Sequence, residues 1–349
     1  MQRPSLAIPR LSACRGVCSL AAWLTATATH AHHSAAIYDS KQIVTVQGSV
    51  TRYEWANPHV YIYIEQCTEA GQKIEWKIEG SPPSILRRLG WSSGTLKAGD
   101  SLSVTGHPVR SASSKTLLPT QIKLAGTTLF DSKAEVAQLT SAGAASAATA
   151  ASTLEGTWLT LLDLKSAGAL EEPDKLPLTT AGTAALKRFD EKTMHPGVNC
   201  VPYPAPIFMI TPDLKRITKG AGVILIGGEF DGAQRTIHLN LTTHEGAPQS
   251  TQGHSIGHWE GSTLVIDTAQ FAYHALGNAY GLPSGTHKHL IERLTPSADA
   301  KSLTYHFELT DPEYLGAPVS GDVKWVFRPE QKFAPLKCNR ENARRYLED

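Results

Sequence analysis

The sequence predicts a mostly β protein made of two β-domains. Short runs of alternating apolar and polar residues recur along the chain, and Gly, Pro and Asp turns separate them. An Ala/Ser-rich stretch at residues 141–152 has no large apolar side chain to bury, which is typical of a linker. The 349 residues are enough for two domains of ordinary size. We predict a signal peptide at 1–31, a first domain at 32–131, a linker at 132–153 and a second domain at 154–349.

The first 31 residues have the layout of a secretory signal peptide. Three arginines and no acidic residue accompany an apolar run over residues 16–29, which is too short to span a bilayer. Small residues at Thr29 and Ala31 favour cleavage after Ala31. We therefore expect a soluble periplasmic or secreted protein that begins at His32 and has no membrane-spanning segment.

The net charge limits the classes of partner that the protein is expected to bind. The whole chain has a net charge of +1, and removal of the three signal-peptide arginines lowers it to −2. The sequence also lacks a basic block. Nucleic acid and anionic membrane surfaces are therefore poor partners, and a small molecule or metal ion is the expected ligand.

The first domain is predicted to be an OB-like barrel. A helix opens at Ser81-Pro82, with Ser81 as the N-cap, and ends at Gly90. It falls between the third and fourth of five strands, which is the order of an OB-fold. The predicted strands cover residues 43–55, 60–64, 74–79, 101–106 and 120–124.

The second domain is predicted to be an antiparallel β-barrel or sandwich. Gly156-Thr157-Trp158 at the entry of its first strand is similar to the opening of lipocalin-like barrels, so a lipocalin-like form is one option. Glu260-Gly261-Ser262 predicts a tight hairpin. Helices are expected only at residues 180–189 and at the C-terminus. Further strands are predicted at residues 223–226, 236–239, 255–259, 263–268, 287–294, 303–309 and 323–327.

Cysteine usage predicts one disulfide. Of the five cysteines, Cys14 and Cys18 leave with the signal peptide. In an oxidising compartment we expect Cys200 to pair with Cys338, which ties the C-terminal tail to the body. Cys67 then remains as a buried free thiol or a soft metal ligand.

Both halves carry motifs that resemble uncharacterised families. The first half has His32-His33-Ser34, Tyr38-Asp39, Gly48, Glu54-Trp55-x-Asn57-Pro58-His59, Gly90-Trp91 and Leu96-Lys97-x-Gly99-Asp100. It resembles a family of exported bacterial domains of unknown function. The second half has Cys200-x-Pro202, Gly253-His254-Ser255-Ile256-Gly257-x-Trp259-Glu260-Gly261, Leu264-Val265-Ile266-Asp267-Thr268 and Glu292-Arg293. It resembles another exported family of unknown function, from which it departs at His258 and Ser262. Neither resemblance implies an activity.

The predicted mature N-terminus suggests a copper site. The α-amine and Nδ1 of His32 can form one chelate ring, and a second imidazole completes an arrangement of three nitrogens suited to copper. His59 or His107 is the expected donor of that imidazole, since His33 is adjacent to His32. Tyr38 or Asp39 is expected as an axial or outer group. Alternatively, His32 lies at a ragged cleaved end and His59 only satisfies a turn.

A second cluster suggests zinc binding or acid–base chemistry. Side chains two or four residues apart on a strand share a face, so two histidine pairs on neighbouring strands can present three imidazoles to zinc. Alternatively, His254 acts as a general base oriented by Asp267, with Glu260 as a further acid–base candidate. The other interpretation is that these histidines lie on solvated faces. The pairs are His254 with His258 and His287 with His289, and the nearby acids are Glu260, Asp267 and Glu292.

Aromatic and apolar residues of the second domain can line a cavity for a hydrophobic or aromatic molecule, or form its core. They are Trp158, Phe208, Met209, Trp259, Phe271, Tyr273 and Tyr280.

Three functions remain open from the sequence. The first is an exported copper-binding protein that uses His32, His59 and His107. The second is an enzyme that acts on a small hydrophobic or aromatic molecule in the C-terminal barrel through His254 and Asp267. The third is a structural adaptor without a small ligand.

Overall fold

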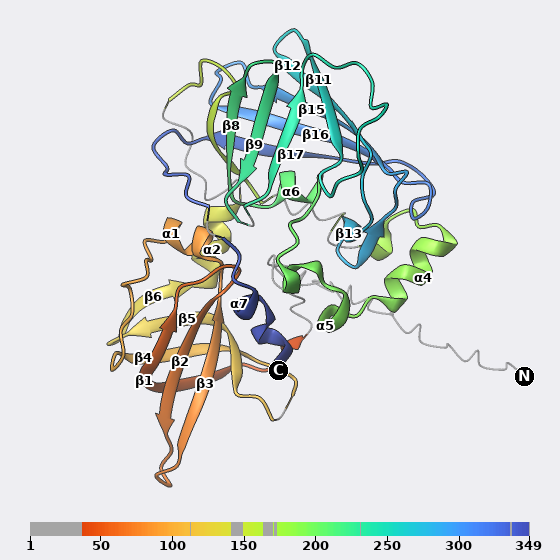
Figure 1. Ribbon diagram of the computed structural model, residues 1–349. Helices are drawn as coiled ribbons and strands as arrows, with labels where there is room; N and C mark the ends of the chain where they lie inside the picture. The colour runs from red at the N-terminus through yellow and green to blue at the C-terminus, as the bar shows by residue number, and fades with distance from the viewer. Residues whose placement is uncertain are drawn as a thin grey trace, which may run out of the picture.

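The structure is a computed structural model with two β-barrels, one from the first part of the chain and one from the second (Figure 1). The predicted mostly β class is confirmed. The predicted signal peptide, His32 and His33 lie outside the residues that the structure describes. Those residues are 37–111, 113–140, 149–162, 170, 173–230, 232–335 and 337–348.

The first barrel has the OB-like arrangement. Neighbouring strands pair antiparallel except β3 and β5, which pair in parallel and close the ring. Helix α1 (Pro83–Arg88) connects β3 to β4. It begins after Pro82 rather than after the predicted cap Ser81, because the Ser81 hydroxyl donates instead to Glu135. The strands are β1 (Val44–Glu54), β2 (Val60–Cys67), β3 (Lys73–Gly80), β4 (Ser101–Pro108) and β5 (Thr116–Leu124).

Strand β2 is buried on both faces, unlike its neighbour β1. Val46 and Val50 of β1 alternate with more exposed residues, as expected of a strand with one face on a core. In β2 the five residues 60–64 are all buried. The C-terminal segment covers the outer face, where Arg345 Nη1 donates to Tyr63 Oη at 3.2 Å.

Two further elements extend the first barrel. Strand β6 (Thr127–Asp131) pairs with β5, and helix α2 (Ser132–Leu139) follows it directly. Asp131 caps α2 by accepting hydrogen bonds from the backbone N–H groups of residues 133 and 134. Helix α2 thus occupies the first part of the segment predicted as a linker, and residues 141–148 lie outside the described part.

The second barrel closes with nine strands. The predicted turn at Gly261-Ser262 joins β11 to β12 as an antiparallel hairpin. The strands are β7 (Gly156–Thr160), β8 (Leu214–Gly220), β9 (Val223–Gly228), β10 (Gln234–His238), β11 (His254–Glu260), β12 (Thr263–Ala269), β15 (His289–Pro296), β16 (Ser302–Thr310) and β17 (Val319–Phe327).

One pairing departs from an all-antiparallel, lipocalin-like barrel. Strands β10 and β11 are parallel, with Ile237 opposite Ser255. A parallel pair needs a connection that returns the chain to the same end of the barrel. Residues 239–253 form this connection. They include His244, whose side chain lies beside Asp267 of β12.

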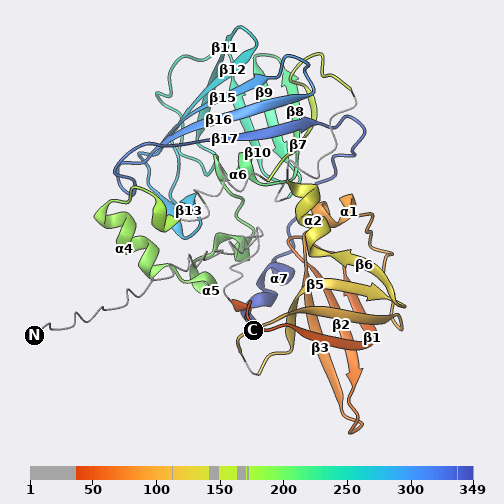
Figure 2. The ribbon, with the colours of Figure 1, turned by 180° about the vertical axis from the view of Figure 1, so that it is seen from behind.

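The predicted helices at residues 180–189 and at the C-terminus are confirmed as α4 (Thr180–Arg188) and α7 (Arg340–Arg344). Helix α7 lies beside the first barrel (Figure 2). Smaller elements that the sequence analysis did not predict are α5 (Glu191–Met194), α6 (Ile207–Ile210), β13 (His274–Ala279) and β14 (Leu282–Ser284).

The C-terminal tail joins the two barrels. The predicted Cys200–Cys338 disulfide is present, and Cys338 forms a β-bridge with Asn57 of the first barrel. Next to it, Arg87 of α1 forms an ion pair with buried Glu229 at 2.8 Å. Cys67 is exposed, so the prediction of a buried thiol is wrong, because it ends β2 where the strand leaves the covered region.

None of the helices in the described part of the chain combines the length and the apolar character needed to cross a membrane.

Candidate functional site

His59 lies at the junction of the two barrels, immediately before β2. Its backbone N–H and C=O both bond to the Asn342 side chain of α7, at 3.2 and 2.9 Å. Its side chain is buried, with Nδ1 3.3 Å from Glu79 Oε1, and Tyr38 Oη donates to Glu79 Oε2 at 2.6 Å. His59 Nδ1 thus lies within ion-pair distance of the Glu79 carboxylate rather than in a well-aligned hydrogen bond, and a carboxylate beside one imidazole nitrogen is common among metal-ligating histidines.

His59 also lines a small cavity between the barrels. The cavity has a volume of about 40 Å³, and its other wall includes His195, Tyr203 and the Cys200–Cys338 disulfide. His195 Nδ1 accepts the Gly197 N–H at 3.0 Å, so its Nε2 carries the proton of the neutral ring and faces Tyr203 Oη at 3.1 Å. Space for a few waters suits an ion better than an organic molecule.

The first described residues run along this end of the first barrel. Ile37 accepts the Arg110 N–H, and Asp39 donates to the Pro108 carbonyl. His107 Nδ1 donates to the Gln42 carbonyl at 2.7 Å. The segment that leads back toward His32 therefore lies next to both predicted imidazole donors. Asp39 forms an ion pair with Arg110 at 3.8 Å.

The residues that the structure describes contain no group of three or more His, Cys, Asp or Glu arranged to hold a metal ion. A metal at His59 would therefore need donors from elsewhere in the chain, and the copper hypothesis assigns them to His32. The cysteine considered as a soft ligand, Cys67, lies at the far end of β2 from His59.

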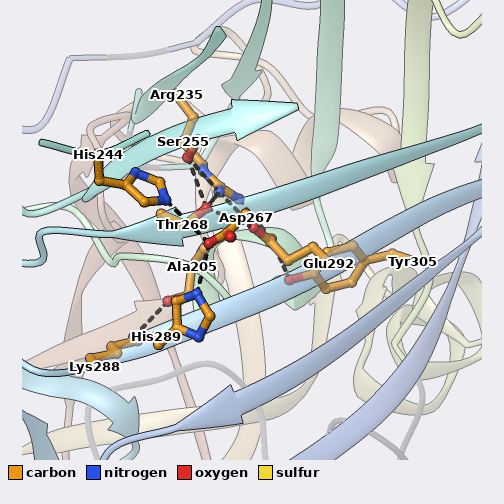
Figure 3. A network of polar contacts seen from close by, with 10 residues as sticks. All are labelled: Ala205, Arg235, His244, Ser255, Asp267, Thr268, Lys288, His289, Glu292 and Tyr305. Carbon is orange, nitrogen blue, oxygen red and sulfur yellow. Dashed lines mark hydrogen bonds and ion pairs between the residues drawn. The ribbon is translucent and has the colours of Figure 1, made fainter. Parts of the chain in front are cut away.

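A second group of residues lies on the outer face of the second barrel, and Figure 3 shows three of them, His244, Asp267 and His289. Asp267 Oδ1 on β12 accepts from His289 Nε2 at 2.7 Å and from His244 Nε2 at 3.2 Å. His244 Nδ1 lies 2.9 Å from His254 Nδ1, and His238 stacks on His254 with ring centroids 5.1 Å apart. We call these five residues the histidine cluster.

The hydrogen bonds of the histidine cluster define the proton positions. His244 Nε2 must donate to the carboxylate, so its Nδ1 is an acceptor in the neutral ring. His254 Nδ1 then donates to it, which leaves the lone pair of His254 on Nε2. Burial and the neighbouring His244 and His238 lower the pKa of His254, so it is neutral at pH 7.

The ion pair between Asp267 and His289 shifts the pKa values of its two members in opposite directions, and each shift favours the charged form. The hydrogen bond from His289 lowers the pKa of Asp267, and the hydrogen bond to Asp267 raises the pKa of His289. The side chain of His289 is 44 % exposed and that of Asp267 is 38 % exposed, so solvent weakens this pair.

Glu260 is not part of the histidine cluster. It lies at the other end of β11 from His254, about 20 Å along the strand. There it pairs with Arg293 at 2.6 Å and with His258 at 3.3 Å. The structure thus brings together the predicted His254, Asp267 and His289, and it places Glu260 and His258 in a separate exposed pair.

The interior of the barrel holds a buried polar network directly behind the histidine cluster (Figure 3). Arg235 forms a bidentate ion pair with Glu292 at 2.8 and 2.7 Å. Tyr305 Oη donates to the same carboxylate at 2.7 Å, and Arg235 Nη2 also reaches Ser255 and Thr268. Glu292, one of the acids predicted near the histidine pairs, therefore has no free oxygen to act as a base.

Lys288 is a further buried basic residue of the barrel. Its Nζ donates to the carbonyl groups of Ala205 and Gly277 and lies 4.6 Å from the Phe271 ring centroid. Burial lowers the pKa of Lys288 to about 7. The ammonium group of Lys288 donates its hydrogen bonds to backbone carbonyl groups, which indicates a structural role.

Sequence reasoning missed His238, His244 and His195. His244 and His195 lie outside regular strands, so no periodic pattern connects them to a site. His238 lies on the same face as His254 because β10 pairs with β11 in the register that places His238 opposite Ile256.

Comparison with known proteins adds one family. No curated protein matches the chain. Residues 21–118 match the model of a family of unknown function, DUF6152. The matched range includes the first four strands of the OB-like barrel, His59 and the predicted mature N-terminus.

Proposed function

We propose that this is an exported copper-binding protein whose site forms where the mature N-terminal His32 meets His59 at the barrel junction. The observation that carries the proposal is the buried His59, which lies 3.3 Å from Glu79 and lines a cavity of about 40 Å³. The size of the cavity favours an ion over a small organic molecule.

The donor set suits copper. His32 supplies its α-amine and Nδ1 in one chelate ring, and His59 supplies Nε2, because Glu79 lies against Nδ1. Copper(II) binds nitrogen donors more tightly than the other divalent ions of its series do. The α-amine has a pKa of about 7.7–8.0, so it loses its proton at little cost near neutral pH.

The six residues from His32 to Tyr38 give the chain enough length for His32 to reach His59. Tyr38 contacts Glu79, which contacts His59. His32 precedes Tyr38 by six residues, and an extended chain of that length spans at most about 20 Å. Tyr38 then acts as an outer group that orients Glu79. His107, which stands beside Gln42, is the alternative imidazole.

Copper titration of single-histidine variants tests the donor assignment. We expect His59→Gln to weaken Cu(II) binding at least about a hundredfold, since loss of a residue that only supports a metal ligand already costs about 10–100-fold and His59 is the ligand itself. His107→Gln should have little effect, and the exposed His258→Gln serves as the matched control. Equal affinity in the His59 and His258 variants would overturn the assignment of His59. Absence of binding in every form would refute the copper-binding function.

A second candidate function is acid–base catalysis at the histidine cluster. The relay from His254 through His244 to Asp267 favours it, because it leaves a neutral Nε2 on His254 whose protonation the carboxylate can stabilise. An activated ester such as p-nitrophenyl acetate is a suitable probe. Loss of hydrolysis in His254→Ala and its retention in His258→Ala would support this function, whereas equal rates would refute it.

A further inference from the structure

We propose that a cleft at the open end of the second barrel binds a small amphiphilic molecule with an apolar body and an anionic end. The cleft has a volume of about 480 Å³, within the usual range of about 300–1,000 Å³ for small-molecule sites. It shares no residue with the cavity at His59, so the two sites are independent.

The cleft lies at the end of the barrel that faces away from the OB-like barrel. Strand β8 begins at Leu214, beside the contact of Arg88 with Pro212, and runs to Gly220. Ile217, Lys219 and Ile224, on either side of the β8–β9 turn, contribute to the cleft, as does the β11–β12 turn. Barrel mouths of this kind are common ligand sites.

The floor of the cleft is apolar. Trp158, Ile217 and Ile224 form it, and all three are otherwise buried in the barrel core. Trp158 Nε1 donates to the Leu154 carbonyl at 2.8 Å, so the only polar atom of that ring is already satisfied. The floor therefore offers hydrophobic contact without a hydrogen bond, which suits a hydrocarbon or aromatic body.

The rim supplies an exposed aromatic ring and a cation. Trp259 is 45 % exposed at the end of β11. Glu155 Oε1 accepts the Lys219 backbone N–H at 3.0 Å, which holds one oxygen of that carboxylate against the strand while the carboxylate keeps its charge. The Lys219 ammonium group forms no ion pair with any described residue, so it is the cation at the rim that the polar end of a ligand can reach. This arrangement favours a carboxylate or sulfonate as the polar end.

Calorimetric titration with sodium dodecanoate, below its micelle concentration, tests the proposal. Dodecanol and dodecyltrimethylammonium serve as neutral and cationic probes of the same chain length. We expect one-to-one binding of dodecanoate, weaker binding of dodecanol and the weakest binding of the cation. Absence of saturable binding by dodecanoate would overturn the proposal, and so would equal binding of the three probes.

Two surface variants separate the apolar and the charged contacts. Trp259→Ala should weaken dodecanoate and dodecanol about tenfold each, the equivalent of one lost aromatic contact. Lys219→Gln should weaken dodecanoate alone by about threefold, and 0.5 M salt should remove this difference. Tyr273→Ala removes a 57 % exposed ring elsewhere and is the matched control. A Trp259 variant that binds like the Tyr273 variant would refute the assignment of this cleft.

Discussion

Removal of the charge on Glu292 is expected to destabilise the second barrel strongly. Its carboxylate is fully buried and neutralises Arg235, whose side chain is 1 % exposed. Glu292→Gln keeps the shape of the side chain but leaves the guanidinium charge without a counter-charge in the barrel interior. Breaking one partner of such a buried pair costs about 3–5 kcal/mol.

Urea unfolding followed by tryptophan fluorescence measures this cost. Trp325 is a local reporter, because its ring stacks on Tyr305 with centroids 6.1 Å apart, and Tyr305 donates to Glu292. The double variant Arg235→Met with Glu292→Leu should recover most of the loss, since replacement of both charges by apolar groups is often close to neutral.

Glu260→Gln is the matched control. It breaks the ion pair with Arg293, whose N···O distance is 2.6 Å but whose side chains are 53 % and 41 % exposed. An exposed pair contributes about 0–1 kcal/mol. If Glu292→Gln cost no more than Glu260→Gln, the argument from burial would be refuted.

Three further perturbations have expected outcomes. Cys200→Ser should lower the free energy of unfolding by about 4–5 kcal/mol, because the disulfide spans 138 residues. Urea unfolding measures this loss, and a loss below about 1 kcal/mol would mean that other contacts alone hold the tail. Asn342→Ala should cost about 1–3 kcal/mol by leaving the His59 backbone unpaired, and copper titration should show weaker binding; unchanged affinity would argue against this anchor. Asp267→Asn should destabilise the protein most between pH 3.8 and 6.5. The pKa of Asp267 is lowered, so its contribution to stability is lost as the pH falls through that pKa. The pKa of His289 is raised, so its contribution is lost as the pH rises through that pKa. A loss of stability that is the same at pH 5 and pH 9 would contradict this coupling.

Strand patterns were predictable from the sequence where one face meets the core and the other meets solvent. The alternation in β1, around Val46 and Val50, is of this kind. Strand β8 was not predicted from the sequence, because a charged residue occupies one of its buried positions. Lys215 is fully buried there and pairs with Asp213. A buried charged pair cannot be distinguished from a solvated one by periodicity.

The candidate site was predictable only in part. Asp267 was predicted to orient His254, and the structure places both in one cluster, where His244 bridges them. His244 enters through the long connection between the parallel strands β10 and β11, and the sequence carries no local signal of that crossover. Glu260 shares a face with His254 but lies six residues farther along the strand, about 20 Å away, so it does not reach the cluster.

The most direct test of the proposed copper site is the electron spin resonance spectrum of the mature protein with one equivalent of Cu(II). The protein would be purified from the periplasm, with mass spectrometry used to verify that it begins at His32. A variant with one extra residue before His32 keeps every side chain but converts the α-amine into an amide. The proposal predicts tight binding with nitrogen couplings in the mature form and its loss in the extended form. Equal, weak binding in both forms would contradict it.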